Sequence, residues 1–261
     1  MVNTIAAIAI VLAITAGWVF VVQRLLPVRI KWRVVGLALI LGALSPVPLL
    51  LLFHLKERLA LPQDPGLADA FMISFTMAGF PEELVKWVAV LAAIFTLRHF
   101  SVFHQQVDRA TAFRLPVLCG LAFAAVENIG YSVNSAVTTM VNSEIGNPLV
   151  VPLVRSLAAS FLHASLGCLM GIFFARVATT PRFNWLAAIG GFFVAVIGHT
   201  AVDWGLIVPV LTMLDRGQDL EPADIEQMVP HFVLAAVAIP MVILAAIACV
   251  FAVRRQVKAA T

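Results

Sequence analysis

Residues 68–97 read ADAFMISFTMAGFPEELVKWVAVLAAIFTL. An α-helix needs about 20 apolar residues to cross a bilayer core that is about 30 Å thick, so this stretch is long enough to span the core with a tilt or a break. Its centre nevertheless carries three ionisable residues, Glu82, Glu83 and Lys86. The stretch therefore predicts a transmembrane helix whose middle forms part of a polar site.

The rest of the chain has the same apolar character. Of its 261 residues, 62% are hydrophobic and 12% are charged, whereas about a quarter of the residues in a soluble domain are charged. The net charge of +3 is too small and too scattered to indicate a nucleic-acid-binding surface. The three cysteines lie far apart within apolar stretches, so neither disulfides nor thiolate metal sites are expected. The composition indicates an integral membrane protein.

Windows of about 19 residues predict seven transmembrane helices and therefore an all-α, polytopic helix bundle. We interpret residues 1–261 as a single transmembrane domain. The first apolar run is too long for the hydrophobic region of a signal peptide and has no preceding positive charge, so we expect it to be a retained span. The predicted helices cover residues 3–22, 34–53, 68–97, 115–140, 149–175, 184–210 and 231–253.

The loop charges indicate the orientation of the chain. Twelve lysines and arginines, Arg114 among them, fall on one side of the predicted arrangement and three on the other. Because cytoplasmic loops carry the excess of positive charge, we expect the N-terminus outside and the C-terminus in the cytoplasm. Residues 215–230 are expected to form an outer loop with a surface helical turn at residues 222–228. An alanine-rich polytopic chain with short loops suits a bacterial inner membrane.

Seven ionisable or histidine side chains lie deep inside the predicted spans, away from the helix ends. Each charged residue at a helix centre costs about 2.5 to 3.5 kcal/mol on insertion scales, so five of them cost on the order of 12 to 17 kcal/mol together. Counted from the outer ends of their spans at about 1.5 Å per residue, all seven lie at similar depths on four different helices. We therefore predict one polar chamber, formed by Glu82, Glu83, Lys86, Glu127, His163, His199 and Asp203.

Other polar and small residues in the spans have structural interpretations. Gly79 and Pro81 predict a kink or a restart of the third helix, with free backbone amides beside the carboxylates. Arg155 lies near an outer helix end and is expected to reach the membrane interface. Asn128 is expected to form hydrogen bonds between helices if it has a structural role.

The chamber residues fit a hydrolytic reaction. No serine or cysteine at comparable depth has an obvious base, so water is the expected nucleophile. Glu82 or Glu83 is suited to act as general base, and His199 to donate a hydrogen bond to a developing oxyanion. Alternatively, Glu127, His163 and His199 hold a zinc ion with a water in the open position, and Glu82 acts as the base. The HExxH signature of many zinc proteases is absent.

Three short motifs follow one another on successive predicted helices. Residues 81–86 contain EExxK, residues 123–128 are FxxxEN and residues 199–203 are HxxxD, with His163 between the last two. In this order they resemble the PrsW family of intramembrane proteases, which is similar to the CAAX prenyl endopeptidases and to the Aph subunit of gamma-secretase. The resemblance covers roughly residues 70–210, and the expected protease core comprises residues 68–210. In the prenyl endopeptidases the second motif ends in histidine, whereas here it ends in Glu127.

The resemblance implies an intramembrane endopeptidase for membrane-anchored proteins, with site-one cleavage of an anti-sigma factor as one expected reaction. It leaves open whether a glutamate or a metal ion activates the water. It implies catalytic or metal-binding roles for the residues that match its motifs, which are Glu82, Glu83, Glu127, His163, His199 and Asp203, with Lys86 as the partner of the first two.

Two other functions are compatible with a polar core in a helix bundle. A non-catalytic scaffold would use it to clasp another membrane protein, as the resemblance to the Aph subunit allows. A proton- or cation-coupled transporter would use it as an ion pathway, although the odd number of spans and the lack of an inverted repeat disfavour this function. The expected partners are a membrane-anchored protein substrate and the lipid bilayer, and no nucleic acid.

Overall fold

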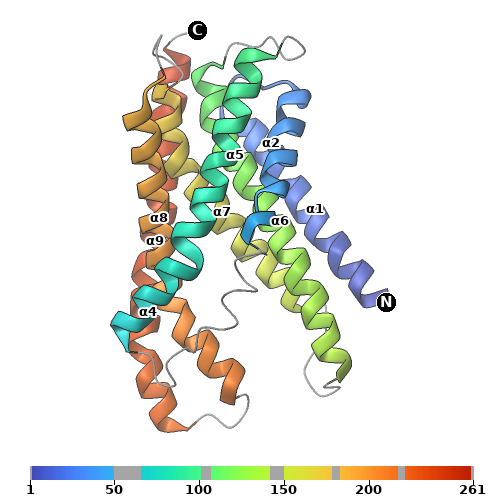
Figure 1. The fold of residues 1–261 in the computed structure, drawn as a ribbon, viewed down its shortest axis with the longest axis vertical. Helices are drawn as coiled ribbons and strands as arrows, with labels where there is room; N and C mark the ends of the chain where they lie inside the picture. The colour runs from blue at the N-terminus through green and yellow to red at the C-terminus, as the bar shows by residue number, and fades with distance from the viewer. Residues whose placement is uncertain are drawn as a thin grey trace.

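The computed structural model describes residues 2–49, 66–100, 107–141, 150–177, 183–216 and 221–259. Within these ranges the chain forms helices and no strands, which confirms the predicted all-α bundle (Figure 1). The elements in chain order are α1 (Val2–Leu25), α2 (Trp32–Leu44), α4 (Leu67–Ser74), the π-helix η1 (Phe75–Gly79), α5 (Phe80–His99), α6 (Arg109–Val141), α7 (Val150–Val177), α8 (Trp185–Arg216) and α9 (Pro222–Lys258).

Six helices among the described residues are long and apolar enough to cross a membrane, and each overlaps a predicted span. They are α1, α2, α6, α7, α8 and α9. The remaining predicted span, residues 68–97, corresponds to α4, η1 and α5, which follow one another without a break. This helical rod contacts α8 along its length (Figure 1). The chain is therefore a polytopic integral membrane protein.

The last transmembrane helix begins earlier in the sequence than predicted. Helix α9 begins at Pro222, so the surface turn expected at residues 222–228 is the first part of α9 and not a separate element. Proline is favoured here because the first N–H groups of a helix have no intrahelical acceptor. The Asp224 carboxylate accepts a hydrogen bond from the Glu221 N–H at 2.9 Å and thereby caps the helix.

The break predicted near Gly79 and Pro81 is a π-helical segment. The Phe80 N–H donates to the carbonyl of Phe75, five residues earlier, and Pro81 has no N–H with which to continue an α-helical pattern. The backbone thus stays helical across the predicted break. At Phe80 a π-type hydrogen bond takes the place of the expected free amide.

Helix α6 lies at the centre of the bundle and contacts α1, α2, α5, α7 and α9. Arg114 on this helix is fully buried. Its guanidinium donates to the carbonyls of Val22 and Leu26 at the end of α1, each at 3.1 Å. The last carbonyls of a helix have no intrahelical donor, so Arg114 caps α1. The prediction that Arg114 is a loop charge is therefore wrong.

Glycines allow the helices of the polar chamber to approach closely. A side chain at Gly120 on α6 would place its Cβ atom 2.8 Å from the backbone carbonyl of His163 on α7. A side chain at Gly79 would collide with Thr200 on α8. These two glycines therefore set the spacing of α6 against α7 and of η1 against α8 next to the predicted histidines.

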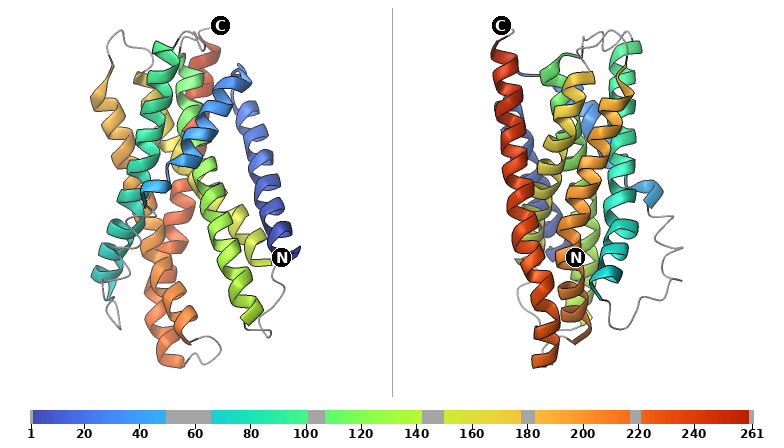
Figure 2. Two further views of the ribbon diagram at one scale, coloured as in Figure 1. Left: turned by 45° about the vertical axis from the view of Figure 1, so that its right-hand side comes forward. Right: turned by 90° about the vertical axis from the view of Figure 1, so that its left-hand side faces the viewer.

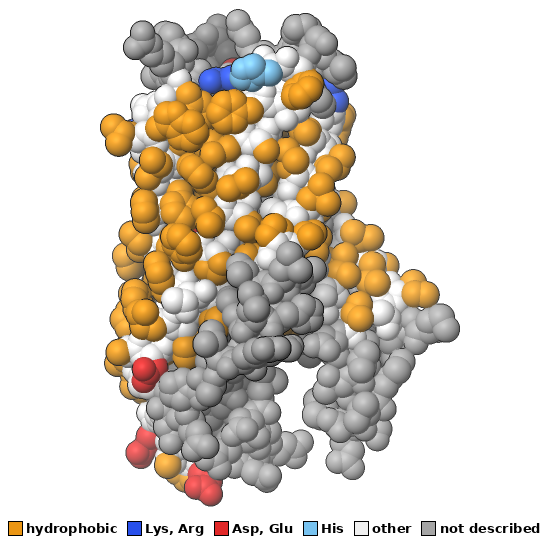
Figure 3. Space-filling model, in the orientation of Figure 1, with side chains coloured by type: hydrophobic (Ala, Val, Ile, Leu, Met, Phe, Trp, Pro, Cys, Tyr) orange, Lys and Arg blue, Asp and Glu red, His pale blue; other side chains and the backbone are white. Residues whose placement is uncertain are grey.

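The two ends of the bundle differ in charge. The termini lie toward opposite ends (Figure 2). On the face shown in Figure 3, Lys, Arg and His side chains gather at the end that holds the C-terminus, and acidic side chains gather at the other end. This separation follows the charge asymmetry of the sequence. The orientation of the bundle in a membrane stays a prediction.

Candidate functional site

All seven residues predicted for the polar chamber lie in one cluster. Glu82, Glu83 and Lys86 occupy the first two turns of α5, immediately after η1. Glu127 comes from α6, His163 from α7, and His199 and Asp203 from α8. Direct contacts between these side chains connect all four helices.

Lys86 lies at the centre of the cluster and is buried. Its ammonium nitrogen Nζ lies 2.7 Å from Glu83 Oε1, 2.9 Å from His163 Nδ1 and 3.4 Å from Glu82 Oε2. The ring of Phe123 lies 4.2 Å from the same nitrogen. Lys86 thus joins the two glutamates to His163, and the aromatic face adds a favourable cation–π contact.

Each histidine is held by a carboxylate. Lysine only donates hydrogen bonds, so His163 Nδ1 accepts from Lys86, and the opposite Nε2–H donates to Glu127 Oε2 at 3.1 Å. In the same way, His199 Nδ1–H donates to Glu83 Oε1 at 2.9 Å. The two imidazole rings are nearly perpendicular, with centroids 5.3 Å apart. The carboxylates fix both the tautomer and the orientation of the rings.

The remaining nitrogen of His199 faces two acids. His199 Nε2 lies 3.4 Å from Asp203 Oδ2 and 3.8 Å from Glu82 Oε2. With its proton on Nδ1, a neutral His199 presents a lone pair toward these oxygens, so three electron-rich atoms converge without a hydrogen bond between them. Such a convergence favours a cation.

The charges of the cluster do not balance, even when Arg155, which forms an ion pair with Glu127, is counted with it. Glu82, Glu83, Glu127 and Asp203 contribute four negative charges, and Lys86 and Arg155 contribute two positive charges. With neutral histidines, the formal charge of the cluster is therefore −2. Burying uncompensated charge is expensive, and one divalent cation would neutralise the cluster.

Three residues of the cluster can share a metal ion. Glu82, His163 and His199 are all buried, and one ligand atom from each lies within 4.8 Å of the others. Two histidines and one carboxylate form a donor set typical of catalytic zinc sites and also suit other transition metals. The set fits a divalent ion and differs from the predicted one, because Glu82 takes the place of Glu127. A direct metal contact for Glu127 stays a prediction.

The cluster has an open side near Glu127 and Asp203. The side chains of these two acids are 22% and 24% exposed, whereas the Glu83 side chain is 2% exposed. Glu83 accepts two close hydrogen bonds, so its charge and position are fixed. Asp203 has no contact with Lys86 or Arg155 at ion-pair distance among the described residues. Asp203 is therefore the carboxylate of the cluster best placed to meet water.

Sequence reasoning missed one member of the site. Arg155, which was expected at the membrane interface, donates to Glu127 Oε1 at 2.8 Å and lies 3.5 Å from the ring centroid of Tyr131. Its position near a helix end gave no signal, because it reaches Glu127 across the contact between α6 and α7. Asn128 is buried, and its side chain has no hydrogen bond among the described residues, so it does not form the interhelical bond considered above.

The chain is similar to known proteins over the region that contains this cluster. The model of the family described as PrsW family intramembrane metalloprotease matches residues 31–245, a range that holds all seven residues. The chain is also similar to Protease PrsW of Bacillus subtilis (strain 168), with 25% identity over 149 residues. That alignment spans 56% of this chain and 58% of the relative. No solved structure matches the chain.

Proposed function

Since the chain belongs to the PrsW family of intramembrane metalloproteases, we propose that it is a metal-dependent endopeptidase. Its substrate is a membrane-anchored protein, and the scissile peptide bond reaches the cluster within the bundle. The observation that carries the proposal is the buried group of Glu82, His163 and His199 in a cluster with a formal charge of −2. A bacterial inner membrane is the proposed location, and an anti-sigma factor is one candidate substrate.

Glu82, His163 and His199 are the proposed ligands of the metal ion. His163 would bind through Nδ1, so the ion would replace the hydrogen bond that this nitrogen accepts from Lys86. A divalent ion bound by them would supply a Lewis acid at the scissile carbonyl. Glu83 and Glu127 orient the two histidines through the hydrogen bonds at 2.9 and 3.1 Å. Carboxylates in this position typically raise metal affinity by 10- to 100-fold.

Asp203 is the proposed general base. It lies beside His199 Nε2, the nitrogen that faces the proposed ion position, and its side chain is partly exposed. A base must lie within hydrogen-bond reach of the water that it deprotonates, and a carboxylate at the open side of the cluster meets this requirement. Asp203 thus takes the role that the sequence suggested for Glu82 or Glu83, and Glu82 becomes a ligand.

Lys86 and Arg155 keep the acids in place. Lys86 holds Glu83 at 2.7 Å, and Arg155 holds Glu127 at 2.8 Å. Each cation thus fixes a carboxylate that in turn orients a histidine. The rigid arrangement keeps the donor atoms in position before the substrate arrives.

The metal content of the detergent-purified protein tests this function. We expect about one divalent ion per chain by mass spectrometry, and little in His163→Ala, His199→Ala and Glu82→Gln. The exposed His99 on the same bundle is the control, and His99→Ala should keep the ion. If Glu82→Gln keeps the metal and loses cleavage of a co-expressed membrane-anchored substrate, Glu82 is the base and not a ligand. Wild-type protein without metal would contradict the metal-dependent mechanism.

The same variants distinguish protease from scaffold and transporter. In a protease, Asp203→Asn retains metal and loses cleavage. In a scaffold, the cluster variants lose thermal stability or partner binding and no cleavage is seen in any of them. In a transporter, the variants change ion flux in proteoliposomes, and the wild type cleaves nothing.

A further inference from the structure

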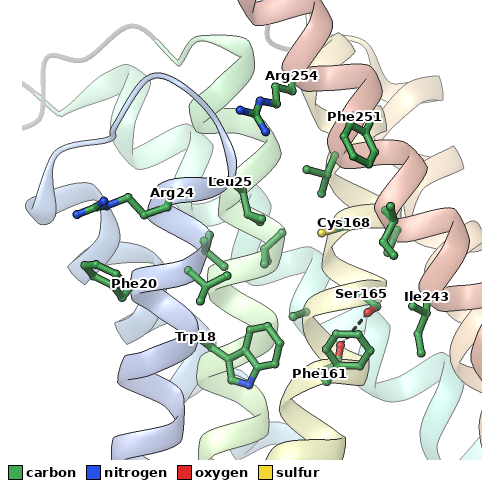
Figure 4. A pocket seen from close by; sticks show the side chains of 17 residues that line it. Trp18, Phe20, Arg24, Leu25, Phe161, Ser165, Cys168, Ile243, Phe251 and Arg254 are labelled. Atoms are coloured by element: carbon green, nitrogen blue, oxygen red, sulfur yellow. Dashed lines mark hydrogen bonds between the residues drawn. The ribbon is translucent and has the colours of Figure 1, made fainter.

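A cavity lies on the side of α7 that faces away from the charged cluster. It is an apolar groove of about 490 Å³ between α1, α7 and α9, with α6 behind it (Figure 4). None of the seven cluster residues lines it. The groove is therefore separate from the proposed metal site, and its function does not depend on the proposed activity.

The interior of the groove suits a hydrocarbon chain. Val22, Val117 and Ala246 are buried residues on its wall. Its one hydroxyl group, that of Ser165, already donates to the carbonyl of Phe161 at 2.8 Å (Figure 4). Because the other side chains along this wall are almost all apolar, the groove offers a ligand mainly apolar contact.

One end of the groove is closed by aromatic rings. Trp18 on α1 and Phe161 on α7 lie with ring centroids 5.5 Å apart. Figure 4 shows this pair at the end of the groove farthest from the helix ends that carry Arg24 and Arg254. A chain that enters from the arginine end therefore meets the Trp18–Phe161 pair at the other end.

The open end of the groove carries two arginines. Arg24 lies in the last turn of α1, and Arg254 lies near the C-terminal end of α9. Both are exposed, and the Arg24 guanidinium lies 4.6 Å from the ring centroid of Phe20. In Figure 4 the Arg254 side chain extends from α9 toward α1, over the groove. Among the described residues no acid lines the groove, and the two charged groups there are both positive.

We propose that this groove binds one anionic phospholipid. One of its acyl chains lies along the apolar wall toward Trp18, and the headgroup phosphate contacts Arg24 and Arg254. Basic pockets between transmembrane helices are typical binding sites for anionic headgroups. An uncharged peptide helix would leave the two arginines without a counter-charge, which the phosphate of an anionic lipid supplies.

Native mass spectrometry of the purified protein with added lipid tests the proposal. The probes are phosphatidylglycerol, which is anionic, and phosphatidylcholine, which is zwitterionic, with matched acyl chains. We expect the wild type to retain one phosphatidylglycerol and to bind phosphatidylcholine more weakly. Two surface arginines contribute together about tenfold or more in affinity, so Arg24→Gln with Arg254→Gln should weaken phosphatidylglycerol binding by at least that factor.

A matched control distinguishes the loss of the groove arginines from a general loss of positive charge. Arg98 and Arg255 are also basic residues in the last turns of helices, and they lie outside the groove. The double variant Arg98→Gln with Arg255→Gln removes the same charge and should bind phosphatidylglycerol like the wild type.

A second pair of variants tests the apolar wall without changing charge. Ala246 is buried in the groove, whereas its neighbour Ala245 is exposed and outside it. We expect Ala246→Phe to release the lipid and Ala245→Phe to retain it. Equal binding of both lipids, equal losses in the two double arginine variants, or cross-linking of a substrate helix or a second copy of the chain into the groove would overturn the proposal.

Discussion

Consecutive residues of α7 face two different environments. His163 contacts Lys86 and Glu127 in the charged cluster, whereas Ala164 and Ser165 line the apolar groove. The helix turns by about 100° per residue, so neighbours in sequence point to different sides. The cluster is recognisable from its charges, but the groove consists of residues that are ordinary in any transmembrane helix. The function of a helix face in a membrane protein is therefore visible in the sequence only where that face is polar.

The difference between the two faces is expected to be largest in catalysis. Replacing His199 by alanine should lower the rate of substrate cleavage by at least about 1000-fold. When catalytic residues act together, the loss of one of them removes most of the rate acceleration. Cleavage of a co-expressed membrane-anchored substrate, followed on gels, measures the effect. His99→Ala is the matched histidine control, and a His199→Ala protein with more than a tenth of wild-type cleavage would contradict the assignment.

Removal of the buried ammonium group of Lys86 should strongly lower the thermodynamic stability of the protein. Lys86→Met leaves Glu83 without the ammonium group at 2.7 Å, so we expect the free energy of unfolding to fall by about 3–5 kcal/mol. Thermal melting in detergent measures the loss, and added divalent metal should reduce it because the ion supplies positive charge.

The comparison substitution on the groove side is Ser165→Ala, whose hydroxyl bonds only to its own helix. We expect it to change the free energy of unfolding by less than about 1 kcal/mol. Similar losses for Lys86→Met and Ser165→Ala would show that the two faces do not differ in this respect.

A smaller effect is expected from the carboxylate that orients His163. Glu127→Gln keeps the shape of the side chain and removes its charge, so metal affinity should fall by about 10- to 100-fold. Competition with a chelator of known affinity measures the change. Glu226 is an exposed acid at the start of α9, so Glu226→Gln is the control. Equal metal affinities in the two variants would show that Glu127 does not support metal binding by His163.

The smallest effect is expected in the groove. Phe161→Leu removes the ring contact with Trp18 and changes packing, so the free energy of unfolding should fall by less than about 1.5 kcal/mol. Metal content and cleavage should stay at wild-type levels, although Phe161 is only two residues from His163. A loss of metal in this variant would mean that the two sides of α7 are coupled.

The sequence was sufficient to predict the helix bundle and the members of the cluster. Charged residues are rare in transmembrane helices because they are costly there, so Glu82, Glu127 and Asp203 were conspicuous, and depth along each helix indicated that they meet. The sequence could not predict which partner each carboxylate binds. Rotation of α5 and α8 about their axes decides that Glu83 bonds to His199 and that an oxygen of Glu82 lies within 4.8 Å of a ring nitrogen of each histidine.

Residues near helix ends were the hardest to assign. Arg114 and Arg155 both looked like ordinary interface charges, yet one caps α1 and the other holds Glu127. An arginine side chain is long enough to reach a neighbouring helix, so the site that it serves depends on tertiary contacts. The groove was not predicted at all, because its walls come from four helices that are far apart in sequence.

The π-helix η1 places a constraint on the length of the chain as well as on its composition. On the N-terminal side of η1, Phe71 of α4 packs edge-on against Trp204 of α8 with ring centroids 5.3 Å apart. On its C-terminal side, Glu83 of α5 bonds to His199 of α8. A π-type turn contains one residue more than an α-type turn. Deletion of one residue from 75–79 would rotate α4 against α5 by about 100°, and the two contacts with α8 would no longer form together. Insertions and deletions in this segment should therefore be tolerated as poorly as substitutions of the carboxylates themselves.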